Sequence, residues 1–199
     1  MLIGLDFDNT IVCYDKAIAQ LAETLPDLPA DLPRVKLALR DFLRGANREP
    51  EWTAFQGAIY GPGMTYAEPF PQALEVMQTL KDMGHPLCIV SHRSLRPYAG
   101  PAYDLHAAAR GWIQKRLACI GLVQNESAFF YETREQKIAA MSTMGCEVFL
   151  DDLPEVLGDE HFPQTCQAIL FDPERSHTQS ECTRIAHWSE LPVLISGQA

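Results

Sequence analysis

The segment LIGLDFDNT, residues 2–10, decides the fold. It begins with an apolar run that is short enough for a buried strand and then turns abruptly acidic. Further along the chain, short apolar runs of the same kind recur between helical stretches. They are residues 86–91, 128–132, 147–152 and 168–172. Such runs are typical of parallel strands that helices cover on both faces, so we predict an α/β protein with a mainly parallel sheet.

Helical patterns separate these strands. In residues 71–84, PQALEVMQTLKDMG, apolar side chains recur at helical spacing and Gly84 is a stop signal. Residues 104–117 and 135–144 also have helical patterns. The alternation of strands and helices supports a parallel sheet.

Residues 14–67 interrupt the alternation, because they contain helical patterns but no good strand. These patterns are residues 15–25, 34–44 and 50–60. We therefore predict a core domain of residues 1–13 and 68–199 and a small helical insertion of residues 14–67. Three aromatic residues of the insertion lie at roughly helical spacing, and we interpret them as its own small core. They are Trp52, Phe55 and Tyr60.

Composition excludes several classes of protein. The 199 residues are 47% hydrophobic and 21% charged, which is ordinary for a soluble globular protein. The net charge of −10 argues against a nucleic-acid polymer or an anionic membrane as partner. No apolar stretch reaches the length of a membrane span and the N-terminus does not resemble a signal peptide. We expect a cytoplasmic protein.

The six cysteines stand far apart, and no two form a C-x-x-C pair. Several lie inside apolar runs, such as Cys88 in PLCIV, where cysteine acts as a small buried hydrophobe. A zinc site or a disulfide framework is therefore not expected.

Polar side chains gather where the predicted strands end. They are Asp6, Asp8, Thr10, Ser91, Asp151 and Asp152. Because ligands of an open parallel sheet bind at the carboxyl ends of its strands, we expect these side chains to converge there. Converging carboxylates repel one another, and Mg²⁺, which prefers oxygen ligands and often binds phosphate oxygens as well, relieves that repulsion. The pattern therefore predicts a magnesium site.

The same residues, in this order, resemble the four motifs of the haloacid dehalogenase-like hydrolase superfamily. The first motif is Asp6-Phe7-Asp8-Asn9-Thr10, and Ser91, Lys137 and Asp151-Asp152 match the others. The resemblance covers the whole chain, and the insertion lies where the family places its first type of cap. It implies a Rossmann-like three-layer sheet with strand order 5-4-1-2-3 and a small helical cap.

The resemblance also implies a role for each motif residue. Asp6 would attack phosphorus and form an aspartyl-phosphate. Asp8 would protonate the leaving oxygen and then activate water. Thr10 and Ser91 would bind the phosphoryl oxygens, and Lys137 would neutralise charge at the reacting group.

The metal would lie against Asp6, Asp151, Asp152 and the backbone carbonyl of Asp8, and the expected cofactor is Mg²⁺. Members of the family that cleave carbon–halogen bonds need no metal and lack an aspartate at the position of Asp8. Asp8 therefore favours phosphomonoester hydrolysis, with a phosphomutase as an alternative within the family.

Simpler interpretations stay open for three of these residues. Ser91 could be a turn or cap hydroxyl, and Asp152 could be the N-cap of the helix that follows it. Lys137 could be a solvated surface lysine, with Arg134 as its competitor for the third motif.

We expect the substrate to be a small phosphorylated metabolite, either a nucleotide or a sugar phosphate. The insertion is large enough to cover such a molecule. The connection of residues 91–104 is long for its type and follows Ser91, so we predict that His92 or Arg93 touches the substrate.

Two other classes of protein share part of this pattern. A receiver-type signalling module also uses aspartates, a hydroxyl and a lysine, but its acidic pair comes early in the chain. A non-catalytic magnesium- and phosphate-binding protein would not need Asp6. The sequence is compatible with a monomer or a homodimer.

Overall fold

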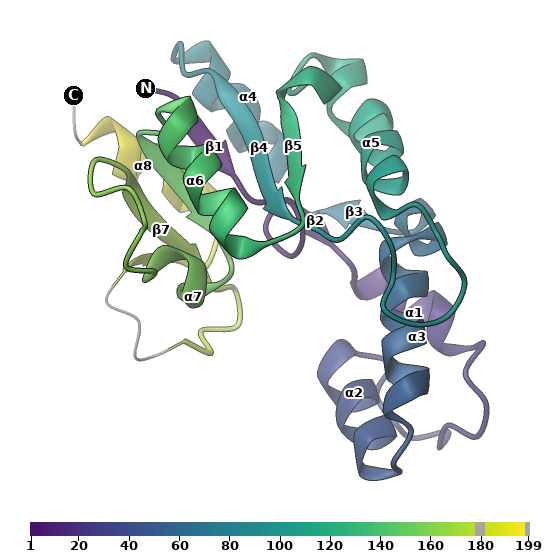
Figure 1. Ribbon diagram of the computed structural model, residues 1–199. Coiled ribbons are helices and arrows are strands. Elements are labelled where there is room, and N and C mark those ends of the chain that lie inside the picture. The colour runs from purple at the N-terminus through teal and green to yellow at the C-terminus, as the bar shows by residue number, and fades with distance from the viewer. Residues whose placement is uncertain (178–181, 198–199) are drawn as a thin grey trace. The chain divides into compact units, whose positions relative to one another are not determined.

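A six-stranded sheet organises the larger part of the computed structural model, which describes residues 1–177 and 182–197 (Figure 1). Within these residues the strand order is β5-β4-β1-β6-β7-β8, and every neighbouring pair is parallel. The strands are β1 (Ile3–Leu5), β4 (Leu87–His92), β5 (Ala128–Tyr131), β6 (Val148–Asp151), β7 (Gln167–Phe171) and β8 (Thr183–Ile185).

The five predicted strands have the predicted order, since 5-4-1-2-3 corresponds to β7-β6-β1-β4-β5. The sixth strand, β8, was not predicted and lies at the edge beside β7. It is only three residues long, and Thr183 and Arg184 are both exposed. Such a short polar segment has none of the apolar patterning that marks a buried strand.

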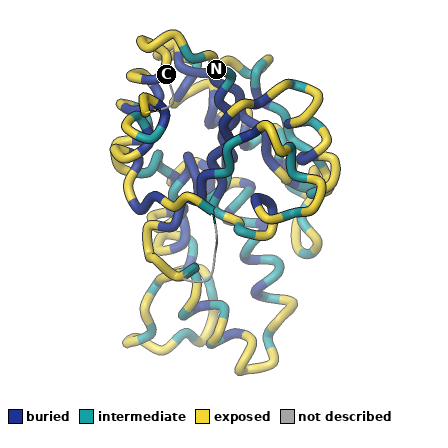
Figure 2. Tube along the Cα trace, turned by 90° about the vertical axis from the view of Figure 1, so that its left-hand side faces the viewer, coloured by how far each residue is buried: buried dark blue, intermediate teal, exposed yellow. Residues whose placement is uncertain are grey.

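Helices cover both faces of the sheet. Figure 1 shows α6 (Arg134–Met144) in front of the sheet and α4 (Ala73–Asp82) behind it. The other helices of this part are α7 (Pro154–Leu157) and α8 (Leu191–Ser196). The central strands β4 and β6 are largely buried and β1 is buried throughout. Figure 2 shows the buried parts of the chain in dark blue. This three-layer arrangement explains why the strands are continuous apolar runs.

The chain divides into two compact units, and the first contains the sheet. It consists of Met1–Val12, Pro69–Arg93 and Ile113–Ala199. The second unit consists of Cys13–Glu68 and Ser94–Trp112. These bounds differ from the predicted domains because Ser94–Trp112, which we assigned to the core, belongs to the helical unit.

Close packing against α3 (Glu49–Tyr60) explains this difference. A Cβ atom at Gly57 would lie 2.7 Å from Cβ of Pro97, and one at Gly100 would lie 3.1 Å from Cβ of Ala54. The connection therefore lies directly against α3, and glycine permits the approach from either side. An unusually long loop after Ser91 was visible in the sequence, but its packing partner was not.

The second unit has its own core, as we predicted for the insertion. Trp52 is 1% exposed and Phe55 is 4% exposed, and their ring centroids are 6.1 Å apart. Tyr60 packs edge to face on Tyr14, with centroids 5.0 Å apart. The other helices of the unit are α1 (Asp15–Ala22), α2 (Lys36–Gly45) and most of α5 (Leu105–Arg116).

Short elements complete the described chain. A two-stranded sheet pairs β2 (Val12–Cys13) with β3 (Glu68–Pro69). The 3₁₀ helices are Pro62–Thr65, Ala118–Ile120, Asn125–Ser127 and Trp188–Glu190. Among the described residues, Cys13, Cys88, Cys119, Cys146 and Cys166 form no disulfide. Among the described residues, no helix combines the length and the apolar character that crossing a membrane requires.

Gly4 allows β1 to lie in the middle of the sheet. A Cβ atom at this position would meet the ring of Phe149 at 2.5 Å and the sulfur of Cys146 at 3.0 Å. We expect Gly4→Ala to lower the free energy of unfolding by about 1–3 kcal/mol, because the packed ring has to shift. Thermal or urea unfolding would measure this change.

Gly111 is the matched control for that substitution. It lies within α5, and an added Cβ would meet nothing within 4 Å. Gly111→Ala should therefore leave stability unchanged or raise it by up to about 1 kcal/mol, because alanine favours the helix. Equal effects at both positions would contradict the steric explanation.

Candidate active site

A tight loop after β1 presents the first motif at the carboxyl edge of the sheet. The backbone N–H of Asp6 donates to the carbonyl oxygen of Leu150 on β6 at 2.9 Å. The backbone N–H groups of Ile11 and Val12 both donate to the carbonyl oxygen of Phe7, and Asn9 adopts a left-handed φ of 58°. The loop therefore turns sharply, and asparagine is one of the few residues that tolerate such a conformation.

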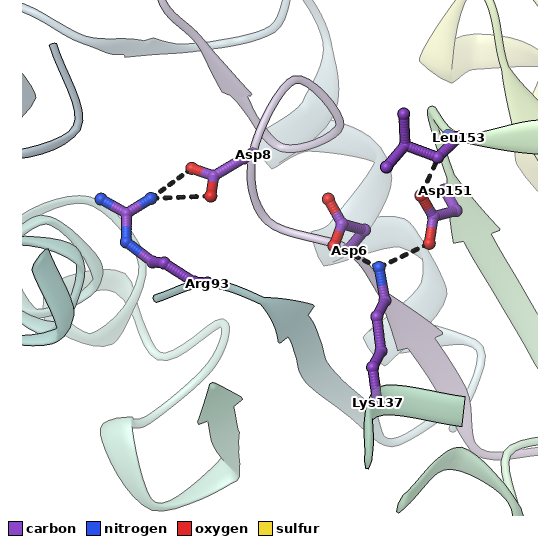
Figure 3. A network of polar contacts seen from close by, with 6 residues as sticks. All are labelled: Asp6, Asp8, Arg93, Lys137, Asp151 and Leu153. Atoms are coloured by element: carbon purple, nitrogen blue, oxygen red, sulfur yellow. Dashed lines mark hydrogen bonds and ion pairs between the residues drawn. The ribbon is translucent and has the colours of Figure 1, made fainter. Parts of the chain in front are cut away.

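Lys137 joins the first and fourth motifs (Figure 3). Its Nζ donates to Oδ1 of Asp6 and to Oδ2 of Asp151, at 2.6 Å each. The lysine lies in the first turns of α6, whose N-cap Thr133 accepts a hydrogen bond from the backbone N–H of Gln136. The side chain is 1% exposed, so it is not a solvated surface lysine.

The three groups shift each other's ionisation. The pKa of Asp6 is raised to about 7: burial is the largest cause, the carboxylates of Asp151 and Asp8 act in the same direction, and Lys137 opposes the rise. Burial acts to lower the pKa of Lys137, but Asp151 and Asp6 outweigh it, so that the net shift is upward. The ammonium group therefore stays charged at neutral pH, while the buried Asp6 carboxylate is held at a free-energy cost.

Three carboxylates could hold a cation. Ligand atoms of Asp6, Asp151 and Asp152 all lie within 4.8 Å of one another. Asp151 is fully buried, and its Oδ1 also accepts a hydrogen bond from the backbone N–H of Leu153 at 3.0 Å, which fixes its direction. Carboxylate oxygens are the donors that Mg²⁺ prefers, and a divalent cation would offset the crowding that raises the pKa of Asp6. These residues therefore fit Mg²⁺.

Two hydroxyl groups are buried beside the first motif. Thr10 is fully buried and Ser91 is 1% exposed, and among the described residues neither Oγ1 of Thr10 nor Oγ of Ser91 has a hydrogen-bond partner. Ser91 lies on β4, which pairs with β1, so that the two hydroxyls belong to adjacent segments of the same edge. A buried hydroxyl without a partner costs free energy, and a bound anion would supply the missing partner.

Asp8 and Arg93 form a partly buried ion pair within the first unit (Figure 3). Nη1 of Arg93 donates to Oδ1 of Asp8 at 2.5 Å and to Oδ2 at 2.7 Å. His92, by contrast, is exposed, and its Nε2 lies 3.0 Å from the carbonyl oxygen of Glu132. The structure therefore brings Arg93 to the acid/base candidate and leaves His92 outside this network.

The structure argues against the simpler interpretations of Lys137, Asp152 and Ser91. Arg134 makes an ion pair with Asp159 at 3.4 Å, so it does not take the place of Lys137. Asp152 is not an N-cap, because the residue before α7 is Leu153. Ser91 lies within a buried strand rather than at a turn or a helix end.

Trp188 supports the site but was not found from the sequence. Its Nε1 donates to the backbone carbonyl oxygen of Thr10 at 3.1 Å, and both groups are buried. The two residues are 178 positions apart in the chain. A tryptophan near the C-terminus carries no sequence signal for such a contact, because only the fold brings it to the loop.

Comparison with known proteins places this geometry in context. No family model matches the chain, and no curated protein matches its sequence. Solved structures do match over nearly the whole length. A haloacid dehalogenase-like family hydrolase from Streptococcus pneumoniae has a TM-score of 0.63 at 14% identity, covering 98% of this chain and 97% of that one. A predicted phosphatase from Clostridium acetobutylicum has a TM-score of 0.62 at 13% identity, covering 98% of each chain.

A dehalogenase is also among the similar structures, with a TM-score of 0.58 at 13% identity over 97% of this chain and 96% of that one. At such low identity the likenesses establish the fold alone. The chain has the α/β fold of the haloacid dehalogenase-like hydrolases, as its motifs predicted.

Proposed function

We propose that the protein is a Mg²⁺-dependent phosphomonoester hydrolase that acts through an aspartyl-phosphate on Asp6. One observation carries the proposal: buried hydroxyls without partners, on Thr10 and Ser91, accompany a buried carboxylate whose ion-pair partner is Lys137. Hydroxyls and an ammonium group bind phosphoryl oxygens. A carboxylate beside them serves as a nucleophile toward phosphorus.

In the first half-reaction, an Asp6 oxygen attacks phosphorus while the bond from phosphorus to the ester oxygen breaks. Asp8 gives its proton to the departing oxygen, so that an alcohol leaves and an aspartyl-phosphate remains. Nζ of Lys137 donates a hydrogen bond to the Asp6 carboxylate. Its positive charge reduces the repulsion between this carboxylate and the approaching phosphoryl group.

In the second half-reaction, water gives a proton to Asp8 as its oxygen attacks the same phosphorus atom. The bond between phosphorus and Asp6 breaks, inorganic phosphate leaves, and the Asp6 carboxylate is restored. Asp8 then carries the proton that the next ester requires. Alternation between acid and base explains why the two half-reactions need only one such group.

Magnesium would bind to Asp6, Asp151 and Asp152, with the backbone carbonyl of Asp8 as the further ligand that we predict. When bound, it would neutralise charge on the phosphoryl oxygens. The chain's own residues supply the nucleophile, the proton carrier and the hydroxyl contacts.

Two features favour a phosphate ester over a carbon–halogen bond as the substrate. Asp8 offers a proton carrier, which a departing halide does not need. The acidic pair Asp151-Asp152 lies within ligand distance of Asp6, and such a group suits a cation that accompanies phosphate. We propose a small phosphorylated metabolite, a nucleotide or a sugar phosphate, as the substrate of a monomer or homodimer.

Metal dependence tests the proposal directly. The protein, stripped with a chelator, would be offered 4-nitrophenyl phosphate, nucleoside monophosphates, sugar phosphates and a short haloacid. We expect phosphate release only after Mg²⁺ is restored. Ca²⁺ is the matched control, because it has the same charge but prefers longer bonds and more ligands, and it should support much less turnover.

Three results would overturn the proposal. They are full activity in the presence of chelator, halide release from the haloacid, and no hydrolysis of any ester with Mg²⁺. Phosphate binding without hydrolysis would instead identify a non-catalytic binding protein, and exchange of phosphate between two positions of one sugar would identify a mutase.

A further inference from the structure

Arg93 contacts the Asp8 side chain and is itself held by two further contacts. Its guanidinium group donates to both carboxylate oxygens, at 2.5 Å and 2.7 Å. The guanidinium carbon lies 5.7 Å from the ring centroid of Phe7, within the range of a cation–π contact. The backbone N–H of Arg93 donates to the carbonyl oxygen of Tyr131 at 2.8 Å, which attaches the arginine to β5.

The exposure of the two partners differs. The side chain of Arg93 is 3% exposed, whereas that of Asp8 is 18% exposed. The arginine is therefore part of the packed interior, while the carboxylate reaches the surface of the site. Buried ion pairs contribute little net stability because both charges lose their hydration. Stability alone does not explain this pair.

We infer that Arg93 is a positioning residue that holds the Asp8 side chain for proton transfer in both half-reactions. The inference rests on the proposed function and replaces our prediction that Arg93 touches the substrate. Two contacts to one buried guanidinium group leave the Asp8 carboxyl group little freedom to turn. Its oxygens therefore keep a fixed direction, and a proton carrier has to be aligned with the reacting atoms in order to act.

In this position Asp8 takes a proton from water in the second half-reaction. Water transfers that proton to an Asp8 oxygen while its own oxygen bonds to phosphorus and the bond to Asp6 breaks. Asp8 gives the proton to the next leaving group, so a misplaced Asp8 slows the first half-reaction only where the leaving group needs that proton. No further reactant is needed.

An experiment with two leaving groups tests this role. Nitrophenolate leaves without help from an acid, so Arg93→Ala should still form the aspartyl-phosphate from 4-nitrophenyl phosphate. Breakdown of that intermediate should slow by about 100-fold, the order of loss expected from a misplaced catalytic group. Rapid mixing should show a burst approaching one nitrophenolate per protein molecule, and acid quenching should trap phosphoprotein. An alkyl phosphate should give slow turnover with no burst.

Two controls separate positioning from folding. Added guanidinium ion should speed breakdown of the intermediate in Arg93→Ala, because it returns a cation to Asp8. For the same reason Arg93→Lys should recover part of the lost breakdown rate. Arg184→Ala is the matched control, since Arg184 also faces a buried aspartate, Asp172, at 3.4 Å in the same unit. It should alter thermal stability and leave turnover and burst unchanged.

The outcomes are distinct. A higher KM for both esters without a burst would mean that Arg93 binds substrate, and would overturn the inference. With 4-nitrophenyl phosphate, an equal loss in both half-reactions, together with a lower Tm and no response to guanidinium, would mean a purely structural role and would also overturn the inference. Failure of the unaltered protein to hydrolyse either ester would overturn the proposed function and the inference with it.

Discussion

Asp6→Asn is expected to abolish ester hydrolysis, with a loss of roughly 10⁴–10⁶-fold in kcat. Asparagine matches aspartate in shape and can still accept the hydrogen bond from Lys137, so the site should keep its structure. The amide cannot form the acyl-phosphate, and acid quenching should therefore trap no phosphoprotein. Steady-state assays with Mg²⁺ and quenched samples of both proteins would measure the two effects.

The same substitution should raise the stability of the metal-free protein above neutral pH. Burial raises the pKa of Asp6 to about 7 from an ordinary value of 3.8. Between these values the folded protein binds a proton that the unfolded chain has released, so this group lowers the free energy of unfolding as pH rises. At pH 8 the unaltered protein carries the full free-energy cost of ionising the buried Asp6 carboxyl group, whereas Asp6→Asn has no group to ionise there. A pKa unit corresponds to about 1.4 kcal/mol, so Tm should rise by several degrees (roughly 2–4 °C per kcal/mol).

Asp172→Asn is the matched control and should behave in the opposite way. Asp172 is 2% exposed, and it accepts hydrogen bonds from the backbone N–H groups of Ser176 and His177. Burial acts to raise the pKa of Asp172, but these hydrogen bonds outweigh it and the net shift is downward. The ionised group therefore stabilises the fold above its unfolded pKa, and this stability is lost as pH falls through the folded value.

We accordingly expect Asp172→Asn to lower Tm at pH 8 and leave kcat unchanged, because the residue lies outside the catalytic network. If Asp6→Asn lowered Tm at pH 8 without metal, or kept measurable turnover, the account of Asp6 as a strained, buried nucleophile would be wrong. Repeating both melts at pH 5 separates the charge effect from packing, since the gain from Asp6→Asn should then fall by more than half as the folded protein binds its proton.

The sequence predicted those parts of the molecule whose signal is local. An apolar run followed at once by Asp6 and Asp8 indicates both the strand and its exposed end, because the change in polarity occurs within a few residues. The order of the motifs then predicted the positions of β4 and β6 around β1. The edge strand β8 has no such signal, since it is short and its packing against β7 comes only from the fold.

Contacts between residues that lie far apart in the sequence could not be predicted, for the same reason. Arg93 was visible as a basic residue in a long connection, but its partner Asp8 lies 85 positions away. The contact of Trp188 with the carbonyl oxygen of Thr10 is a further case. The role of Lys137 was harder still to predict from the sequence. Only its burial between two carboxylates distinguishes it from a lysine on the surface of a helix.

Lys137→Met should be the most damaging single substitution to stability within the site. It removes the cation from between Asp6 and Asp151, both of which are buried, and keeps the length of the side chain. Breaking a buried ion pair by removing one partner typically costs about 3–5 kcal/mol, because the remaining charge is uncompensated. Here two carboxylates remain. Activity should also fall, by about 10²–10³-fold, since a group that stabilises developing charge is lost.

Magnesium should then restore stability but not activity. A cation that binds only the folded protein raises Tm more the more tightly it binds. In Lys137→Met the cation no longer competes with an ammonium group for Asp6 and Asp151. The Mg²⁺-induced rise in Tm should therefore be larger in this variant than in the unaltered protein, while turnover stays low at saturating Mg²⁺. Lys115→Met, at an exposed position of α5, should change neither Tm nor kcat appreciably. If Lys137→Met had the same Tm as the unaltered protein, or if its Tm did not change with Mg²⁺, the lysine would not be holding the two carboxylates together.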